Sequence, residues 1–212
     1  MMDELERYML SLVPRRSPVM ERLEREAERD HVPIIGPQEG HFLYMLAEMI
    51  QAREALELGT AIGYSALWIA AAVQPRGGQV ITVERNPHMA ARARANVKEA
   101  GYADVVSVVE GEAWDVLNHL GGTFDFIFVD VLRSFTDAES APRLLEALLP
   151  HLRVGGLLVA DNALHIGNPS SSGSTLTEQG IREYNRRAAQ KPELAVTVLP
   201  VRDGISIALR LA

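Results

Sequence analysis

The chain has 212 residues, of which 47% are hydrophobic and 23% charged, as in an ordinary soluble globular domain. It has no cysteine, which excludes disulfides and thiolate metal sites, and its net charge of −7 disfavours a broad nucleic-acid surface. No apolar run reaches the roughly 18 residues that span a bilayer, and the charged N-terminus is unlike a signal peptide. We therefore expect a single cytoplasmic domain over residues 1–212, without membrane contact.

The N-terminal segment, residues 1–30, is expected to form two helices, over 3–12 and 18–30, separated by prolines. In the second helix, apolar residues recur at spacings of three and four on a mostly charged surface. This pattern suits a solvated surface helix or an arm that contacts a second copy of the chain. A third helix is expected from Pro37 to Ile50, because proline is favoured at a first helical position.

From residue 55 onward, nearly continuous apolar strands alternate with helices, which predicts a doubly wound, mostly parallel α/β sheet covered on both faces. The expected strands are 55–58, 79–84, 105–109, 124–129 and 156–160, and the expected helices are 64–73, 87–100, 113–120, 138–149 and 175–189. The last two strands, 194–201 and 204–210, flank an Asp-Gly turn and should form an antiparallel hairpin.

The stretch around Gly59 and Gly63 joins the first strand to a helix through a tight turn. Its two glycines let a ligand approach the main chain, and the following helix begins with free N–H groups at Tyr64 and Ser65. The next strand ends in Glu84, about 20 residues past the turn, where nucleotide-binding folds place a carboxylate for ribose hydroxyls. This spacing indicates a site for an adenosine-containing cofactor; the alternative is a strand–turn–helix unit without a ligand.

Polar side chains also follow the fourth and fifth strands. Asp130, Asp161 and Asn162 should converge if these strands are neighbours, and their oxygens suit Mg²⁺, Mn²⁺ or Ca²⁺. The alternative is that Asp130 caps the next segment and Asp161-Asn162 form an Asx turn. His165, three residues past Asn162, is a candidate base beside such a cation, although a lone histidine is more often structural.

Together these motifs resemble those of the cation-dependent O-methyltransferases that use S-adenosylmethionine, a family that includes catechol and caffeoyl-coenzyme A enzymes. The resemblance covers roughly residues 31–211 and is carried by 57–66, 82–84, 124–130, 160–162 and Asp203-Gly204. Short strings at 30–34, 59–65 and 84–86 are most similar to bacterial members that methylate 5-hydroxyuridine in transfer RNA.

The resemblance implies a class I methyltransferase fold, with a seven-stranded sheet whose last strand is antiparallel. It implies that Glu84 binds the cofactor ribose and that Asp130, Asp161 and Asn162 hold a divalent cation. The acceptor would be a small aromatic hydroxyl compound or transfer RNA, and residues 1–30 would contribute to a homodimer. The candidate cofactor-binding residues are Ile35, Gly59, Thr60, Gly63, Tyr64, Ser65, Glu84, Arg85, Gly111, Glu112, Ala113 and Asp130.

One position departs from the family pattern. Three residues after the first metal aspartate the family typically carries lysine, and this chain has Arg133. Lysine can lose its proton and act as a base, whereas arginine stays charged. We expect Arg133 to lie beside the metal site and to attract an anionic acceptor or stabilise its phenolate, or else to pair with Asp137 or Glu139. The candidate catalytic residues are Asp130, Arg133 and His165.

Two other classes of protein remain open at this point. A nicotinamide-dependent oxidoreductase uses the same glycine turn, but the terminal hairpin and the Asp161-Asn162 pair disfavour it. A non-catalytic cofactor-binding protein is conceivable because of Arg133. The serine-rich segment 170–174 lies just past the expected site and fits a lid or a plain solvent loop equally well.

Overall fold

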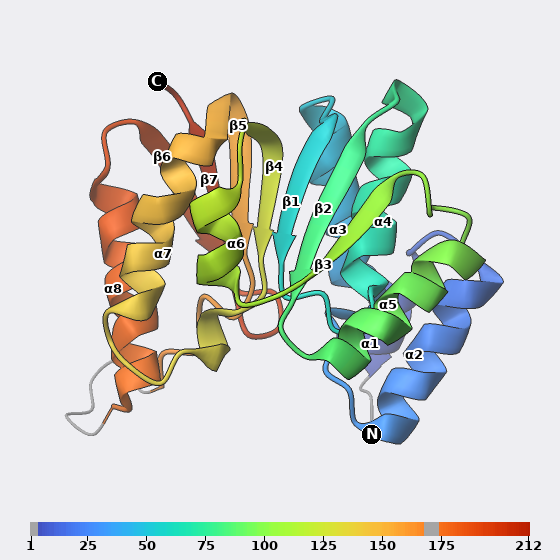
Figure 1. The fold of residues 1–212 in the computed structure, drawn as a ribbon. Coiled ribbons are helices and arrows are strands. Elements are labelled where there is room, and N and C mark those ends of the chain that lie inside the picture. The colour runs from blue at the N-terminus through green and yellow to red at the C-terminus, as the bar shows by residue number, and fades with distance from the viewer. Residues whose placement is uncertain (1–3, 168–173) are drawn as a thin grey trace.

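A computed structural model describes residues 4–167 and 174–212, which form one sheet of seven strands in the order β3-β2-β1-β4-β5-β7-β6 (Figure 1). The first five strands pair in parallel, and β7 is antiparallel to both β5 and β6. Their bounds are β1 Glu54–Leu58, β2 Gln79–Glu84, β3 Val106–Glu110, β4 Phe124–Val129, β5 Leu152–Ala160, β6 Leu194–Leu199 and β7 Ile205–Arg210. The predicted doubly wound sheet and its antiparallel hairpin are confirmed.

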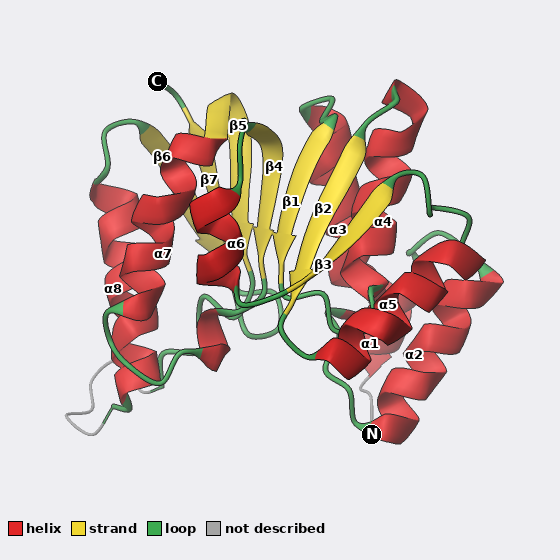
Figure 2. Cartoon of the chain, in the orientation of Figure 1, coloured by secondary structure: helices red, strands yellow, loops and turns green. Residues whose placement is uncertain are grey.

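Helices cover both faces of the sheet (Figure 2). Their bounds are α1 Glu4–Ser11, α2 Pro18–Asp30, α3 Gly36–Met49, α4 Tyr64–Val73 and α5 Pro87–Glu99 on one side, and α6 Ala113–His119, α7 Ser140–Leu148 and α8 Leu176–Gln190 on the other. No helix in the described part of the chain is long and apolar enough to cross a membrane.

Apolar side chains alternate between the two faces of the strands, which explains why helices cover both faces of the sheet. In β4, Phe126 and Phe128 belong to the core under α2 to α5, whereas Ile127 and Val129 belong to the core under α6 to α8. Successive side chains of a strand point to opposite faces, so a strand that is apolar throughout must be buried on both. Helix α2 contributes Leu23 to the first core, so most of the N-terminal segment is integrated into the body of the molecule.

The structure corrects the bounds of several elements, most of them by one or two residues. Strand β5 begins at Leu152 rather than at Gly156, because a register shift lets Leu152 pair with Phe124 before the regular ladder starts at Leu157. Strand β6 ends at Leu199, so the hairpin turn takes up residues 200–204 and is longer than the Asp-Gly pair suggested. The candidate lid at 170–174 falls almost entirely outside the described residues.

The parallel strands bring their carboxyl ends to one edge, the lower edge in Figure 1. The turn between β6 and β7 reaches the same edge, since Ser206 of β7 pairs with Ala160 at the end of β5. From this turn, Arg202 donates a hydrogen bond to the carbonyl of Ile34, 2.9 Å away, in the segment that precedes α3. Three distant parts of the chain therefore meet at this edge.

Candidate functional site

A cavity of about 570 Å³ opens at the carboxyl edge of the sheet. This volume lies within the range of roughly 300–1,000 Å³ that is usual for small-molecule sites. The predicted site residues that line it are Gly59, Glu84, Arg85, Gly111, Glu112, Ala113, Asp130, Arg133 and Asn162. The cavity thus joins the expected cofactor residues to part of the expected metal set.

The β1–α4 turn and Glu84 form a prearranged half of the cavity. Gly59 has a φ of +100°, and a Cβ there would lie 2.7 Å from the carbonyl oxygen of Asp130, so a side chain is excluded. The Glu84 carboxylate accepts hydrogen bonds from the N–H groups of Ala61 and Asn86, each at 2.8 Å. It is therefore fixed in place while keeping lone pairs for a cofactor hydroxyl.

Several predicted cofactor residues support the turn rather than line the cavity. The Tyr64 hydroxyl donates to Glu24 at 2.7 Å, and its ring meets Trp68 edge-on. Gly63 has a φ of +88°, and a Cβ there would reach Ala93 at 3.4 Å. The α4 N-terminus is thereby tied to α2 and α5.

Glu57 was not anticipated as part of the site. It is fully buried in β1, and burial raises its pKa to about 7, while the hydroxyls of Ser65 and Thr82 act in the opposite direction. The Thr82 hydroxyl donates to Glu57 and also bonds to the Thr60 hydroxyl. Thr60 and Ser65, both predicted cofactor residues, therefore hold a buried network beneath the turn. A carboxylate inside an apolar strand was the available signal.

The expected metal residues do converge, because β4 and β5 are neighbours and Val129 pairs with Ala160 just before Asp130 and Asp161. Asn162 has a left-handed φ of 61°, and its N–H donates to the Asp161 carboxylate at 2.6 Å. This contact joins adjacent residues and is not the Asx turn of the alternative, because the N–H of Ala163, two residues after Asp161, donates to the carbonyl of Gly204. The contact coexists with the convergence, since Asn162 lines the cavity together with Asp130.

Glu39, in the first turn of α3, adds a third carboxyl group that was also not anticipated. It is fully buried, and its carboxyl group is close enough to Asp161 for the two to interact electrostatically. Burial and then Asp161 raise the pKa of Glu39, and the same two causes raise the pKa of Asp130 well above its ordinary value. Burial also raises the pKa of Asp161. We call Glu39, Asp130 and Asp161 the acidic cluster.

Two arginines approach the acidic cluster from the surface. Arg202 places Nη1 3.7 Å from the Glu39 carboxylate and is half exposed. Arg133, in the short 3₁₀ turn η2 (Leu132–Ser134), places Nη1 3.3 Å from Asp203 and is also half exposed. Arg133 therefore lies beside the site as predicted, with Asp203 rather than Asp137 or Glu139 as its partner. Both charges lower the pKa of Asp130.

His165 is less centrally placed than expected. Its backbone N–H donates to the carbonyl of Asn162 at 3.0 Å, which closes the turn after β5. The residue is partly buried and lines neither of the two cavities described here. Its role as a base remains a prediction.

Aromatic side chains form a wall that the sequence did not reveal. Trp114 and Phe135 line the cavity with their ring centroids 6.4 Å apart, and the Arg143 guanidinium lies 5.3 Å from the Trp114 ring. These flat apolar surfaces suit an adenine or an aromatic acceptor. The two residues are distant in sequence and meet only in the fold.

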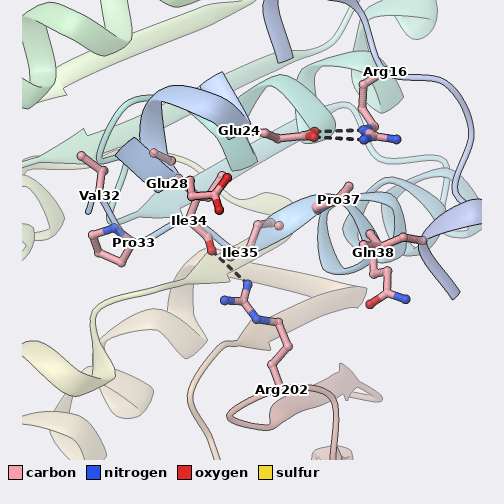
Figure 3. A pocket seen from close by; sticks show the side chains of 13 residues that line it. Arg16, Glu24, Glu28, Val32, Pro33, Ile34, Ile35, Pro37, Gln38 and Arg202 are labelled. Carbon is pink, nitrogen blue, oxygen red and sulfur yellow. Dashed lines mark hydrogen bonds and ion pairs between the residues drawn. The ribbon is translucent and has the colours of Figure 1, made fainter. Parts of the chain in front are cut away.

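A second cavity of about 530 Å³ lies between the N-terminal helices, residues 32–38 and Arg202 (Figure 3). Its wall includes Arg16, which binds Glu24 through two hydrogen bonds of 2.9 and 3.0 Å. Ile35, a predicted cofactor residue, lines this cavity and not the first. Val32 and Pro33 line both, so the two cavities are adjacent.

The donor set fits a hard cation. Asp130, Asp161 and Asn162 offer two carboxylates and an amide oxygen, and both oxygens of Glu39 lack a hydrogen-bond partner among the described residues. Within residues 4–167 and 174–212, no three His, Cys, Asp or Glu side chains are arranged to bind a metal together. A cation here would therefore rely on Asn162 and water for its remaining ligands.

A sequence model of the O-methyltransferase family matches residues 11–211. The chain belongs to this family. It is 35% identical over 185 residues to a catechol O-methyltransferase of Niastella koreensis, covering 82% of this chain and 81% of the relative. It is 29% identical over 228 residues to a caffeoyl-CoA O-methyltransferase of Petroselinum crispum, covering 99% and 92%.

A solved O-methyltransferase of Streptomyces achromogenes, in complex with S-adenosylmethionine, superposes with a TM-score of 0.87 at 26% identity, covering 100% of this chain and 97% of that one. The chain is an S-adenosylmethionine-dependent O-methyltransferase of the catechol and caffeoyl-CoA type. Family membership rules out the nicotinamide-dependent alternative.

Proposed function

We propose that this methyltransferase transfers a methyl group to a hydroxyl on an aromatic ring that carries a second oxygen, with the help of a divalent cation. The observation that carries the proposal is one cavity lined by Glu84, Asp130 and Asn162. It offers a ribose-binding carboxylate and hard cation ligands in a single space. The names of the catechol and caffeoyl-CoA relatives support an acceptor with adjacent ring oxygens.

The chain's own residues account for cofactor binding. Glu84 accepts hydrogen bonds from the ribose hydroxyls, since its carboxylate lines the cavity and is held by two backbone amides. Gly59 allows the methionine part to pass close to the main chain. Gly111 to Ala113 contact the adenine, and Trp114 closes that side with a flat apolar surface.

Asp130 and Asn162 in the cavity wall, together with Asp161, would hold the cation and thereby position the acceptor. A bound divalent cation lowers the pKa of the acceptor hydroxyl. The acceptor oxygen then attacks the methyl carbon, the carbon–sulfur bond breaks, and its electron pair stays on sulfur. Arg133 cannot accept the proton, so it contributes a fixed positive charge near the phenolate, while His165 or solvent receives the proton.

A methyl-transfer assay tests the proposal with a catechol, the matching monophenol and hypomodified transfer RNA, each with excess Mg²⁺ and with excess chelator. We expect turnover of the catechol that chelation abolishes and Mg²⁺ restores, and little turnover of the monophenol. Undiminished activity in chelator contradicts the cation. Methylation of transfer RNA alone supports the alternative acceptor, 5-hydroxyuridine. The adjacent arginines Arg186 and Arg187 of α8 would be candidates for an RNA contact. Both pair with Glu183, however, which reduces the basic surface that they offer to RNA.

We also propose that the methyltransferase forms a homodimer through its N-terminal helices. Leu5, Tyr8 and Leu12 are 63%, 62% and 65% exposed on and just after α1, and Met49 of α3 is 75% exposed. Such an apolar surface is unusual on a monomer. Sedimentation should give a dimer, and the double variant Leu5→Lys/Leu12→Lys should shift it towards monomer. A monomeric wild type at working concentration contradicts the proposal.

A further inference from the structure

Glu39 is a buried carboxyl group without a hydrogen-bond donor. Its side chain is fully buried, and neither carboxylate oxygen accepts a hydrogen bond from a described residue. Arg202 comes within 3.7 Å, but it is half exposed and donates its hydrogen bond to the carbonyl of Ile34. A buried charge left in this way costs several kcal/mol, so a compensating group is expected.

The neighbours of Glu39 make the need for compensation greater. Asp161 is only 6% exposed, and both Asp161 and Asp130 are close enough to Glu39 to act on it electrostatically. Three carboxyl groups, one from α3 and two from the residues directly after β4 and β5, therefore act on one another electrostatically. A divalent cation together with Arg202 would balance their three negative charges.

We propose that Glu39 belongs to the cation site and accepts a hydrogen bond from a water molecule bound to the cation that Asp130, Asp161 and Asn162 hold. This inference rests on the proposed function. Contact through water agrees with the absence, among the described residues, of three acidic side chains arranged to bind a metal together. Mg²⁺ usually keeps several of its waters, which need acceptors of their own.

The competing explanation is that Glu39 and Asp161 share a proton and serve packing alone. The two explanations differ in cation affinity. A carboxylate that holds a metal-bound water strengthens cation binding, and outer ligands of this kind contribute about 10- to 100-fold to affinity. A protonated acid pair contributes nothing to it.

Titration with Mn²⁺, followed by electron paramagnetic resonance of the free ion and by Mg²⁺ competition, separates these explanations without cofactor or acceptor. The variants are Glu39→Gln, Asp161→Asn and the control Glu48→Gln, which removes the same charge from α3 where Glu48 pairs with Arg76. We expect Glu39→Gln to bind Mn²⁺ about 10- to 100-fold more weakly, Asp161→Asn more weakly still, and Glu48→Gln like the wild type.

Thermal unfolding gives a second readout. In chelator, Glu39→Gln should unfold at a higher temperature than the wild type, because it removes repulsion within the acidic cluster, and excess Mg²⁺ should stabilise it less. Glu39→Asp keeps the charge and should retain intermediate affinity. Equal Mn²⁺ affinity for the wild type and both Glu39 variants overturns the inference and leaves the proposed function intact. A wild type that binds no Mn²⁺ overturns the cation in the proposed function, and this inference with it.

Discussion

Glu84 and the acidic cluster, which reaches the same cavity through Asp130, hold their carboxyl groups in opposite ways. Glu84 is held by two backbone amides and is partly exposed, so its charge is compensated before any cofactor arrives. In the acidic cluster, Glu39 is fully buried and receives no hydrogen bond among the described residues, and the pKa of each member is raised, chiefly by burial.

This difference predicts how strongly Glu84 and the acidic cluster each depend on a bound ligand. In the proposed function, a cofactor hydroxyl adds to the Glu84 carboxylate that two backbone amides already hold, so removing this carboxylate is expected to lose one contact. In the same proposal, the acidic cluster gains its compensating positive charge only when a cation binds, so removing one member is expected to change both the binding of that charge and the stability of the free protein. The following experiments test that contrast.

The largest effect is expected for Asp161→Asn. It removes a negative charge from the cation site while keeping the side-chain shape, and kcat/KM should fall by about 100-fold or more. The KM for S-adenosylmethionine should change little, because Asp161 does not line the cavity beside Glu84. Steady-state kinetics with saturating Mg²⁺ measure this. Asp104→Asn, an exposed substitution far from the site, is the control; comparable losses in both variants contradict the prediction.

Glu57→Gln tests whether the buried carboxyl group beneath the β1–α4 turn is as well compensated as that of Glu84. The pKa of folded Glu57 is about 7 against an ordinary 4.5, so between these values the folded state binds the proton more tightly than the unfolded state. The free energy of unfolding should therefore fall as pH rises through this window, by something on the order of 3 kcal/mol. Glu57→Gln should lose that part of the fall.

Urea unfolding of the wild type and Glu57→Gln at pH 5 and pH 8, both with excess Mg²⁺, measures the difference. The Mg²⁺ limits the contribution of the acidic cluster, which titrates in the same direction. Parallel pH dependence in the two proteins shows that Glu57 is ionised in the same range whether folded or unfolded.

The sequence predicted the sheet well because its signals are local. Continuous apolar strands, a glycine turn and an Asp-Gly turn each depend on a few adjacent residues, whereas the strand order depends on pairing between distant segments and was not predicted. The early start of β5 was missed because it depends on pairing across strands. Leu152 reaches Phe124 only through the shift near Gly155-Gly156, where a Cβ on Gly156 would lie 2.8 Å from the carbonyl of Asp125.

The site residues likewise divide into those with a local sequence signal and those that only tertiary packing brings to the site. Asp130, Asp161 and Glu84 could be proposed from the sequence because the two aspartates directly follow strands and Glu84 ends one, whereas Glu39 and Trp114 enter from helices that tertiary packing brings to the edge. Glu39 did carry a signal, because it shares the buried stripe of α3 with Leu43 and Leu46 at helical spacing. Tyr64 is the opposite case. It lies in the predicted turn motif, but its hydroxyl donates a hydrogen bond to Glu24 in α2.

An intermediate effect is expected for Glu84→Ala. Affinity for S-adenosylmethionine should fall by about 1–3 kcal/mol, the range for a hydrogen bond to a charged group. Glu110→Ala is a matched control, since Glu110 ends the neighbouring strand, pairs in register with Glu84 and does not line the cavity. Calorimetry measures both. Unchanged affinity in Glu84→Ala removes this residue from the cofactor site and reverses the contrast between Glu84 and the acidic cluster.

The smallest effect is expected for Arg133, which lies near the surface in the same cavity wall as Asp130. Its ion pair with Asp203 is half exposed on both sides, so Arg133→Ala should change the free energy of unfolding by less than about 1 kcal/mol. The acceptor KM should nevertheless rise, because a positive charge near Asp130 is lost where the phenolate forms, while the affinity for S-adenosylmethionine stays the same.

Arg133→Lys distinguishes charge from shape. Lysine keeps the positive charge and should retain most of the activity. Unlike arginine it can also lose a proton, so the pH profile of kcat should gain a dependence that the wild type lacks. Kinetics of the three proteins on one catechol, from pH 6 to pH 10, measure this. If wild type and Arg133→Ala give equal kinetics with every accepted substrate, the residue has no part in catalysis, and the acidic cluster works through its carboxylates alone.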